Sequence, residues 1–563
     1  MLRHMKVCCC ILTLLEFIVC PLDAFSDGAN SHVGIDAPFG RLEFSLPTIS
    51  SREFQIVDYG ARPSEKCTDA IAKAMTACHA AGGGRVVVPR GTWLTGKVHF
   101  KSNCELHLAE GAVLEFSDDP KDYLPVVHTS WEGVECLNYS PLIYAYGVEN
   151  VAVTGPGEIS ARMATWRSWF GRSPAHMQAT ESLYHWCSTN APMHVRDLTA
   201  IANSHVRPHL IQMNRAKNVR LEGFYIRNSP FWTIHLYHSE NCVVRGLRSF
   251  CHGNNNDGVD VEMTRNVLSE DCDLDQGDDG IVLKAGRNQD AWRLARPTEN
   301  VVVRRCNLHM SHSLLGIGSE LSGGVRNVWM TDCRVESTHA LLKIKTNRRR
   351  GGFVENVWVD NVICSDNVKD SVFSLDTDTI YQWAQFPDYE LKYTAIRNIN
   401  IRNAMAGTCD WIANLKGDAH LPPRDLTVDG LSVRFARRGE RQISNCENVS
   451  IRNLQITHPE EVALEKLRRS IIVKLEDATL GPAFFTQRSN ALPEVKRLQK
   501  VEQFPSEEDG DYHVNLFPGE YDVRWPRKDG REGIGSLSVK PSGESFFRRI
   551  NVSGNFIHRG PAP

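Results

Sequence analysis

Short strands of alternating apolar residues recur along most of the chain, and an asparagine precedes each of them. Most intervals between these asparagines are about 23 to 34 residues, which is typical of a solenoid whose coils stack on one another. Asparagine suits a turn because its side chain bonds the local backbone and tolerates the left-handed region. The Val and Ile that follow favour strands buried on one face. The asparagines are Asn150, Asn218, Asn241, Asn266, Asn300, Asn327, Asn356, Asn398 and Asn448.

This repeat predicts an all-β fold, a right-handed parallel β-helix over residues 54–465. A propeller would need longer blades, and a leucine-rich horseshoe would need a pattern dominated by Leu. Near the start of the repeat, Asp69 to Ala80 carries Ile71, Met75 and Cys78 at helical spacing. We therefore expect one helix to cap the N-terminal end of the β-helix.

The residues before the repeat predict an export signal and a connecting segment. Residues 1–24 combine Arg3 and Lys6 with an apolar run from Val7 to Val19, as in a secretory signal peptide. This run is too short for a membrane span, which needs about 20 residues. We expect an exported protein, periplasmic or extracellular. Residues 25–53 lack periodicity and are interpreted as a linker or a loosely tied arm.

Two further segments break the repeat. Residues 160–206 are rich in Trp, Tyr and His but have no clear period, which indicates a long functional loop rather than disorder. Residues 480–563 contain new strand patterns, at Tyr512 to Leu516 and Glu520 to Trp525 among others, separated by turn residues. They predict a small C-terminal β-sandwich-like module, either a solubilising cap or spacer or a carbohydrate- or surface-binding module.

Charge and cysteine content narrow the classes of function. A net charge of -3 over 563 residues gives no field suited to nucleic acid or to an anionic membrane. The 17 cysteines lack close-paired metal spacing, so no metal site and no cofactor are expected. Several occupy similar places in successive repeats and are expected to stack as small buried side chains, with room for one or two disulfides in an oxidising compartment. These are Cys242, Cys272, Cys306, Cys333 and Cys364.

Three acids carry the strongest chemical signal. Asp257 precedes one short apolar run, and the pair Asp278 and Asp279 precedes the next, about 21 to 22 residues later. On neighbouring coils of a β-helix, about 4.8 Å apart, these carboxylates would share one patch of surface. Crowded like charges raise at least one pKa, a cost tolerated where a protonated acid must sit beside an ionised base. Glycoside hydrolysis needs such a pair.

Cationic side chains follow the acids at the same place in later repeats. His312 precedes an apolar strand about one long coil further on, and Lys343 and Lys345 follow after one more coil. Alternation puts the two lysines on the same face of a strand. Stacked beside the acids, they would bind an anionic substrate, with each lysine acting as a point charge.

Together these motifs resemble glycoside hydrolase family 28, the polygalacturonases. The resemblance covers residues 54–457 and rests on N-N-D at Asn255 to Asp257, G-D-D at Gly277 to Asp279, a His before G-I-G-S-E, and K-I-K at Lys343 to Lys345. The sequence departs from the family pattern where Asn256 replaces Thr, Ser311 and Ser313 replace the two glycines around His312, and Lys343 replaces Arg.

The resemblance implies an inverting hydrolase acting on a pectic polysaccharide or oligogalacturonide. Asp278 would be the general acid, Asp257 and Asp279 would activate water, His312 would tune the acid, and Lys343 and Lys345 would hold the uronate carboxylate. Inverting enzymes keep their carboxyl groups about 6.5 to 9.5 Å apart, which neighbouring coils could provide. We further expect a set of polar residues to line the cleft and bind substrate: Asn255, Asn228, His235, Lys284, Arg287 and Glu320. The aromatic insertion would wall one end of the groove and make cleavage exo-acting.

Two other functions remain as alternatives. A polysaccharide lyase on the same fold would use the acids to hold calcium and would need a base for the C5 proton. A non-catalytic glycan-binding solenoid would keep the aromatic and cationic residues without needing all three acids. The pairing of D-D with K-x-K favours hydrolysis. Homogalacturonan, rhamnogalacturonan and xylogalacturonan-type branches all stay open as substrates.

Overall fold

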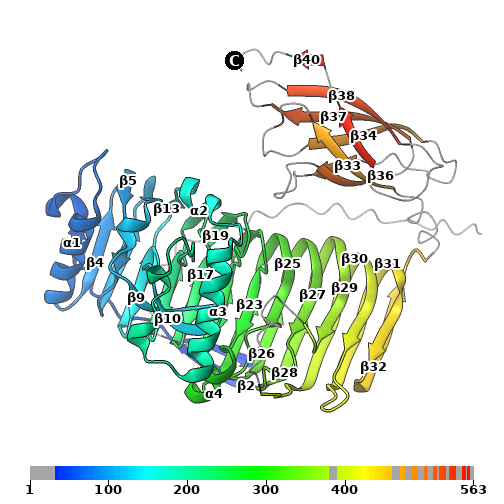
Figure 1. The fold of residues 1–563 in the computed structure, drawn as a ribbon, viewed down its shortest axis with the longest axis horizontal. Helices are drawn as coiled ribbons and strands as arrows, with labels where there is room; N and C mark the ends of the chain where they lie inside the picture. The colour runs from blue at the N-terminus through cyan, green and yellow to red at the C-terminus, as the bar shows by residue number, and fades with distance from the viewer. Residues whose placement is uncertain are drawn as a thin grey trace, which may run out of the picture.

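A computed structural model describes residues 32–379 and 390–459, and then strands and bridge residues between 469 and 557. The expected signal peptide at residues 1–24 lies outside the described residues. In the described part, the main body is the predicted right-handed parallel β-helix (Figure 1), a single sheet of 28 strands. Among the described residues no helix is both long and apolar enough to cross a bilayer.

The central coils, from β11 to β23, each contribute three short strands that pair in register with the coils before and after them, and from β24 onward these strands merge into fewer, longer ones. Ile211, Ile234, Val259 and Ile281 are such partners on four successive coils. The strands are β3 (Glu53–Gln55), β4 (Gly84–Val88), β5 (Gly91–Thr95), β6 (Val98–His99), β7 (Cys104–Leu108), β8 (Ala112–Phe116), β11 (Ile143–Tyr146), β12 (Glu149–Thr154), β13 (Glu158–Ala161), β14 (Ile211–Asn214), β15 (Lys217–Glu222), β16 (Tyr225–Arg227), β17 (Ile234–Tyr237), β18 (Glu240–Arg245), β19 (Arg248–Cys251), β20 (Val259–Glu262), β21 (Arg265–Glu270), β22 (Asp273–Gln276), β23 (Ile281–Lys284), β24 (Thr298–Arg304), β25 (Asn307–Gly318), β26 (Val325–Thr331), β27 (Arg334–Lys345), β28 (Phe353–Asp360), β29 (Ile363–Asp376), β30 (Ala395–Lys416), β31 (Arg424–Ser444) and β32 (Glu447–Ile456).

The repeated asparagines form a ladder along one edge of the coils. All nine have a positive φ, as expected from their turns, and lie between +49° and +59°. The amide group of Asn241 donates to Asn218, and that of Asn266 donates to Asn241, so each coil is bonded to the next. The same contact continues to Asn300, Asn327, Asn356 and Asn398. The ladder supplies polar partners at turns where the backbone cannot pair regularly.

The interior of the β-helix is one continuous apolar core of stacked Val, Ile, Leu and Cys side chains. The five cysteines expected to stack are all buried in this core. The thiol of Cys306 contacts those of Cys272 and Cys333 on the coils before and after it. The cysteines of the described residues are free thiols.

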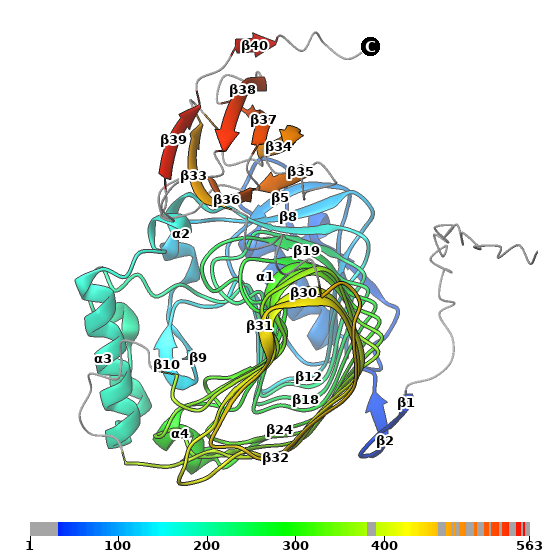
Figure 2. The same cartoon turned by 90° about the vertical axis from the view of Figure 1, so that its right-hand side faces the viewer.

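The N-terminal end is closed by α1 (Thr68–Ala80), which buries Ile71, Met75 and Cys78 as its spacing predicted. The preceding segment differs from the linker or arm that we expected. Residues in it form an antiparallel hairpin of β1 (His32–Ala37) and β2 (Gly40–Ser45), which lies along the outside of the coils (Figure 2). Ile35 and Phe44 are buried there against the outer residues of the β-helix, so apolar burial fixes the hairpin.

Two excursions from the coils cover one outer face of the β-helix. One is the hairpin of β9 (Val127–Trp131) and β10 (Val134–Asn138). The other is the aromatic insertion, which holds α2 (Ala164–Ser168), α3 (Pro174–Thr189), η3 (Met193–Val195) and η4 (Leu198–Ala200). They share an apolar cluster that includes Trp131, Leu183 and Phe231. Thr129 and Ser130 of the hairpin bond the outward side chains of Gln212 and His209, so the hairpin lies directly on the sheet.

The remaining helices are short, namely η1 (Ile56–Tyr59), η2 (Pro120–Tyr123) and α4 (Asn288–Leu294). The expected C-terminal β-module is present as two sheets around one core that includes Val473, Phe485, Tyr521 and Trp525. Its first strand precedes the boundary of residue 480 that we expected. The strands are β33 (Arg469–Leu475), β34 (Ala483–Asn490), β35 (Lys500–Gln503), β36 (Tyr512–Leu516), β37 (Gly519–Pro526), β38 (Glu532–Val539), β39 (Arg548–Val552) and β40 (Asn555–Ile557).

Candidate active site

The coils bring the three predicted acids together. Asp257 lies in the turn before β20, and Asp278 and Asp279 lie in the turn before β23, on the next coil. One carboxylate oxygen of each acid lies within 4.8 Å of one from each of the others. The winding of the solenoid therefore gathers residues that are remote in sequence, as the repeat predicted.

Asp279 is ionised by its neighbours although it is buried. Ser313 Oγ donates to its Oδ1 at 2.5 Å, and the Nζ of Lys345 donates to its Oδ2 at 2.9 Å. Burial alone would raise the pKa of Asp279, but the ammonium group of Lys345 and the hydroxyl of Ser313 outweigh burial and lower it. Ser313, which replaces a family glycine, is therefore a hydrogen-bond donor to the cluster.

Asp278 is the most accessible of the three acids and is paired with the predicted histidine. Its side chain is 21% exposed, and its Oδ1 contacts His312 Nδ1 at 3.0 Å. Burial would raise the pKa of Asp278, but the hydrogen bond from His312 lowers it. The same bond raises the pKa of His312. Asp278 and His312 thus favour an ion pair in the free protein.

Asp257 carries the proton that crowded carboxylates must share. Burial, with the charge of Asp278, raises the pKa of Asp257 to about 8. Neutral pH therefore leaves Asp257 protonated while Asp278 and Asp279 are ionised. This places the resting proton on a different acid from Asp278, the general acid implied by the family resemblance. Closely coupled acids titrate as a group, so the proton belongs to the cluster as a whole.

The nearest oxygens of the three acids lie within 4.8 Å of one another. The separation of about 6.5 to 9.5 Å that is usual for an inverting glycosidase is measured between whole carboxyl groups, so it is a different quantity. The separation that we expected for an inverting enzyme therefore stays a prediction.

Both predicted lysines lie on the outer face beside the acids. Lys343 pairs in register with Gly316 and Lys345 with Gly318, and both side chains are partly exposed. The charge of Lys343 contributes to the low pKa of Asp279. On the other side of His312, the ring of His339 lies 4.9 Å from it, centroid to centroid. His312, His339, Lys343 and Lys345 therefore border the acids on the side nearer the C-terminal end of the β-helix.

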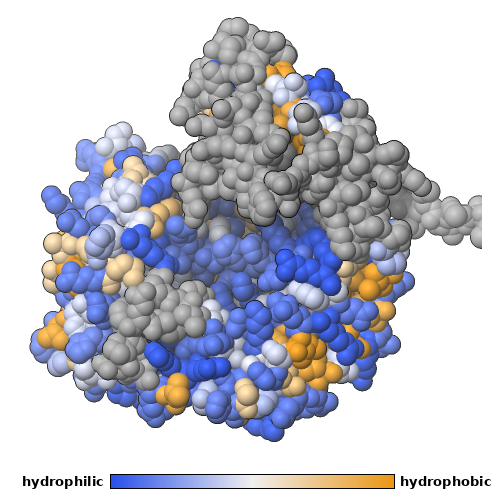
Figure 3. Space-filling view, turned by 45° about the vertical axis from the view of Figure 1, so that its right-hand side comes forward, coloured by the Kyte–Doolittle hydropathy of each residue, from blue (hydrophilic) through white to orange (hydrophobic). Residues whose placement is uncertain are grey.

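A pocket of about 310 Å³ lies on the other side of Asp278. Its walls come from the β9–β10 hairpin and the aromatic insertion as well as from the coils. The lining includes four rings and several polar groups: Trp131, Trp169, Phe170, His176, Glu132, Arg172, Arg207, Asn254, Asn255 and Asp278. A space-filling view shows that the molecule is hollowed on one face and mainly hydrophilic there (Figure 3).

The family described as glycosyl hydrolases family 28 matches residues 78–458 of the chain. The chain belongs to this family. It is therefore a glycoside hydrolase, a class of enzyme whose chemistry needs a pair of carboxyl groups. The match spans the β-helix from α1 to the end of β32.

Individual members of family 28 resemble the chain over most of the β-helix. A probable polygalacturonase of Vitis vinifera is 24% identical over 72% of this chain and 79% of its own length. An exo-poly-alpha-D-galacturonosidase of Dickeya chrysanthemi is 25% identical, with 63% of each protein covered. The crystal structure of a hyperthermoactive exopolygalacturonase from Thermotoga maritima is 32% identical, with a TM-score of 0.68, over 73% of this chain and 93% of that one.

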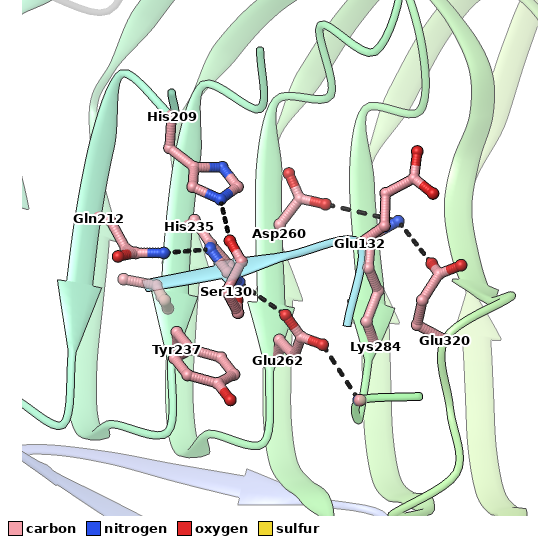
Figure 4. A network of polar contacts seen from close by, with 12 residues as sticks. Ser130, Glu132, His209, Gln212, His235, Tyr237, Asp260, Glu262, Lys284 and Glu320 are labelled. Carbon is pink, nitrogen blue, oxygen red and sulfur yellow. Dashed lines mark hydrogen bonds and ion pairs between the residues drawn. The ribbon is translucent and has the colours of Figure 1, made fainter. Parts of the chain in front are cut away.

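Four residues that we expected to bind substrate in this family 28 site are buried beneath it instead. His235, Lys284, Arg287 and Glu320 are at most 6% exposed. His235 bonds Gln212 and Glu262 (Figure 4), and Arg287 bonds Glu320. The expectation of direct substrate contact was wrong because the β9–β10 hairpin covers this part of the outer face.

The other two expected ligands lie in different places. Asn255 lines the pocket, and its Oδ1 accepts a hydrogen bond from Arg207. Asn228 lies in a left-handed turn, and its backbone N–H donates to Phe250, away from the pocket lining. The sequence interpretation missed Trp131 and Arg207 as pocket residues. The unpatterned aromatic insertion was the signal for Trp169 and Phe170, whereas Trp131 lies in a hairpin that resembles ordinary strands.

Proposed function

We propose that this family 28 protein is an exported, exo-acting polygalacturonase, which removes galacturonate from one end of pectic chains with inversion of the anomeric centre. The observation that carries this proposal is the cluster of Asp257, Asp278 and Asp279, flanked by Lys343 and Lys345 and bordered by an aromatic-walled pocket. Polygalacturonate offers a glycosidic bond for the acids and a carboxylate on every sugar for the cations. The relatives from Vitis vinifera and Dickeya chrysanthemi are named as a probable polygalacturonase and an exo-poly-alpha-D-galacturonosidase.

The exposed position of Asp278 supports its role as the general acid. It lines the pocket, so it can reach the glycosidic oxygen of a bound chain, whereas Asp257 and Asp279 are buried beneath. Asp278 gives its proton to the leaving oxygen as the bond to the anomeric carbon breaks. Asp279 and Asp257 orient a water on the opposite face, and the water proton passes to their carboxylates as its oxygen bonds the anomeric carbon.

This sequence of events needs the cluster proton on Asp278 when the bond breaks. A sugar bound against Asp278 replaces the water that stabilises its charge, and desolvation raises the pKa of a carboxyl group. Because the nearest oxygens lie within 4.8 Å, a single proton can move from Asp257 to Asp278 within the cluster. Substrate binding then prepares both the acid and the base.

The lysines support recognition of a uronate. Lys345 already donates to Asp279, and Lys343 is partly exposed next to it on the same face. Two ammonium groups beside the reacting bond would attract the sugar carboxylate and orient the ring. An ammonium group binds a carboxylate as a point charge, so Lys343 in place of the family Arg keeps the charge but gives up bidentate geometry.

The pocket supports cleavage at a chain end. The aromatic insertion and the hairpin close the groove on the side of Asp278, and their rings offer stacking surfaces to a sugar. A groove that is closed on one side takes only a terminal residue there. The apolar run from Val7 to Val19 supports export, since pectic polymers lie outside the cell.

A product time course on defined oligogalacturonates tests the proposal. At the earliest time points we expect only monogalacturonate and the chain one residue shorter. Oligomers of several lengths among these initial products would contradict exo cleavage. An unsaturated product that absorbs in the ultraviolet and disappears with a chelator would indicate a lyase. Binding without turnover on any pectic oligomer would indicate a glycan-binding solenoid.

A further inference from the structure

We propose that Lys284 is a positioning residue for the reaction: its buried ammonium group holds Asp257 in place beneath the substrate and favours transfer of the proton from Asp257 to Asp278 when the sugar binds. This inference rests on the proposed hydrolase function. It assigns a role to a side chain that lies too deep to touch the sugar, since Lys284 is 5% exposed.

Lys284 lies at the end of β23, among three carboxylates and one ring. Its Nζ is 3.6 Å from Asp257 Oδ2, 3.7 Å from Asp260 Oδ1 and 3.5 Å from Glu320 Oε2. The face of Trp232 covers its other side, with the ring centroid 4.4 Å away. Figure 4 shows the ammonium group of Lys284 between the carboxylates of Asp260 and Glu320.

The neighbouring acids do not compete equally for this ammonium group. Both oxygens of Asp260 lack a hydrogen-bond partner among the described residues, and burial, with the charge of Asp257, raises its pKa well above the ordinary value. Burial therefore opposes the charged form of Asp260. Burial likewise raises the pKa of Glu262 to about 8, so below this pH Glu262 is neutral beside His235. Burial thus weakens these two acids as counter-charges for Lys284.

Glu320 is ionised but is satisfied by another cation. Arg287 Nη2 donates to Glu320 Oε1 at 2.7 Å, and Ser319 Oγ donates to the same oxygen. Burial would raise the pKa of Glu320, but Lys284 and Arg287 lower it below its ordinary range. Arg287 and Lys284 share the charge of Glu320, and among the groups that raise the pKa of Lys284 the carboxylate of Asp257 comes first. The ammonium group of Lys284 opposes the burial and the Asp278 charge that keep Asp257 protonated.

The hairpin fixes this arrangement from the outside. The backbone N–H of Arg287 donates to Gly133 O at 2.8 Å, and its Nε donates to Glu132 O at 2.9 Å. Arg287 Nη1 also donates to the hydroxyl of Tyr184 on α3. The hairpin and α3, which form walls of the pocket, thus fix Arg287. Arg287 in turn fixes Glu320, and Glu320 and Asp257 together fix the position of Lys284. A mobile ammonium group could not set the charge of one acid in this way.

The test compares Lys284→Met, Lys284→Arg and Glu320→Gln by kcat, KM and the pH profile on trigalacturonate. We expect Lys284→Met to lower kcat at least about tenfold with little change in KM, and to move the limb on which activity rises with pH upward by about one unit. Lys284→Arg, which keeps the positive charge, should retain most of kcat and leave the rising limb near its original pH. Glu320→Gln should move that limb downward, because Lys284 then has one competing carboxylate fewer. Lys217→Met, an exposed lysine on β15, is the control.

The outcomes separate this inference from the proposed function. Absence of hydrolysis by the unaltered protein would defeat the proposed function itself. If that protein is active and neither Lys284→Met nor Glu320→Gln moves the pH limb, Lys284 is only structural and the inference is wrong. If Lys284→Met does not fold, the other two variants decide the matter. Lys284→Arg should leave the rising limb of the pH profile in place, whereas Glu320→Gln should move it to lower pH.

Discussion

Replacement of Asp278 by Asn is expected to lower turnover of oligogalacturonates by about 10²- to 10⁴-fold, the usual contribution of a general acid. Asn has the same shape and can still accept the hydrogen bond from His312, so the fold and KM should change little. Asp275→Asn is the matched control, because Asp275 belongs to the same coil but pairs with His252. Full activity of the Asp278 variant would contradict its role.

A change of leaving group identifies which acid donates the proton. An aryl galacturonide has a leaving group that needs little protonation, so loss of the acid costs much less on this substrate. We expect Asp278→Asn to recover activity on the aryl substrate, and Asp257→Asn to be impaired about equally on both substrates. The reverse pattern would mean that Asp257, which holds the resting proton, is also the donor.

Replacement of Lys345 by Met is expected to lower the free energy of unfolding by about 3 to 5 kcal/mol, because it leaves the charge of Asp279 buried without its cation. Asp279 is 1% exposed, so water cannot take the place of the ammonium group. Denaturant unfolding at pH 7 measures the effect. Lys416→Met is the control, since Lys416 lies two coils further along the same row and is exposed.

The pH dependence and a double variant test the cause of this loss. In the unaltered protein the pKa of Asp279 lies below its unfolded value, so its stabilisation is present above the unfolded pKa and is lost as the pH falls through the folded one. The deficit of Lys345→Met should therefore shrink as the pH falls. Adding Asp279→Asn should recover stability without recovering activity. Equal deficits at all pH values would contradict the charge explanation.

The sequence predicted the parts of the molecule that depend on local pattern and on coil-to-coil stacking. Asn241 and Asn266 signalled the ladder turns because only a few residue types tolerate their backbone angles. Asp257 and Asp279 lie close together because one repeat length separates them, and parallel coils keep such residues in register. In a solenoid, residues one repeat length apart lie side by side. The residues of its site can therefore be predicted from their spacing in the sequence.

The errors arose where one part of the chain covers another. Lys284 and His235 do point outward from the coils, as alternation predicts, but the β9–β10 hairpin crosses this part of the outer face, where it bonds their neighbours His209 and Arg287 (Figure 4). The alternation of residues in β17 and β23 gives no sign that a hairpin more than 90 residues earlier in the chain will cover them. For the same reason the expected arm proved to be a hairpin, since Phe44 finds its partners only on the assembled outer face of the β-helix.

The burial of these charges also explains why ionisation could not be predicted from the motifs. The resemblance assigned roles to Asp257 and Asp278, but the pKa of each depends on Lys284 and His312, whose distances follow from packing. Ser313 is a further example. In the sequence it is only a serine in place of a family glycine, and the hydrogen bond from its hydroxyl to Asp279 follows from the packing of the coils.

The most direct test of the central claim is proton NMR of trigalacturonate during the first turnovers, which follows the anomeric configuration of the new reducing end. If the clustered carboxylates activate water against the face opposite the leaving group, the α-linked substrate should release the β-anomer first, with slow mutarotation afterwards. Release of the α-anomer would mean that a carboxylate attacks the sugar directly, and an unsaturated product would mean that water does not take part in the cleavage.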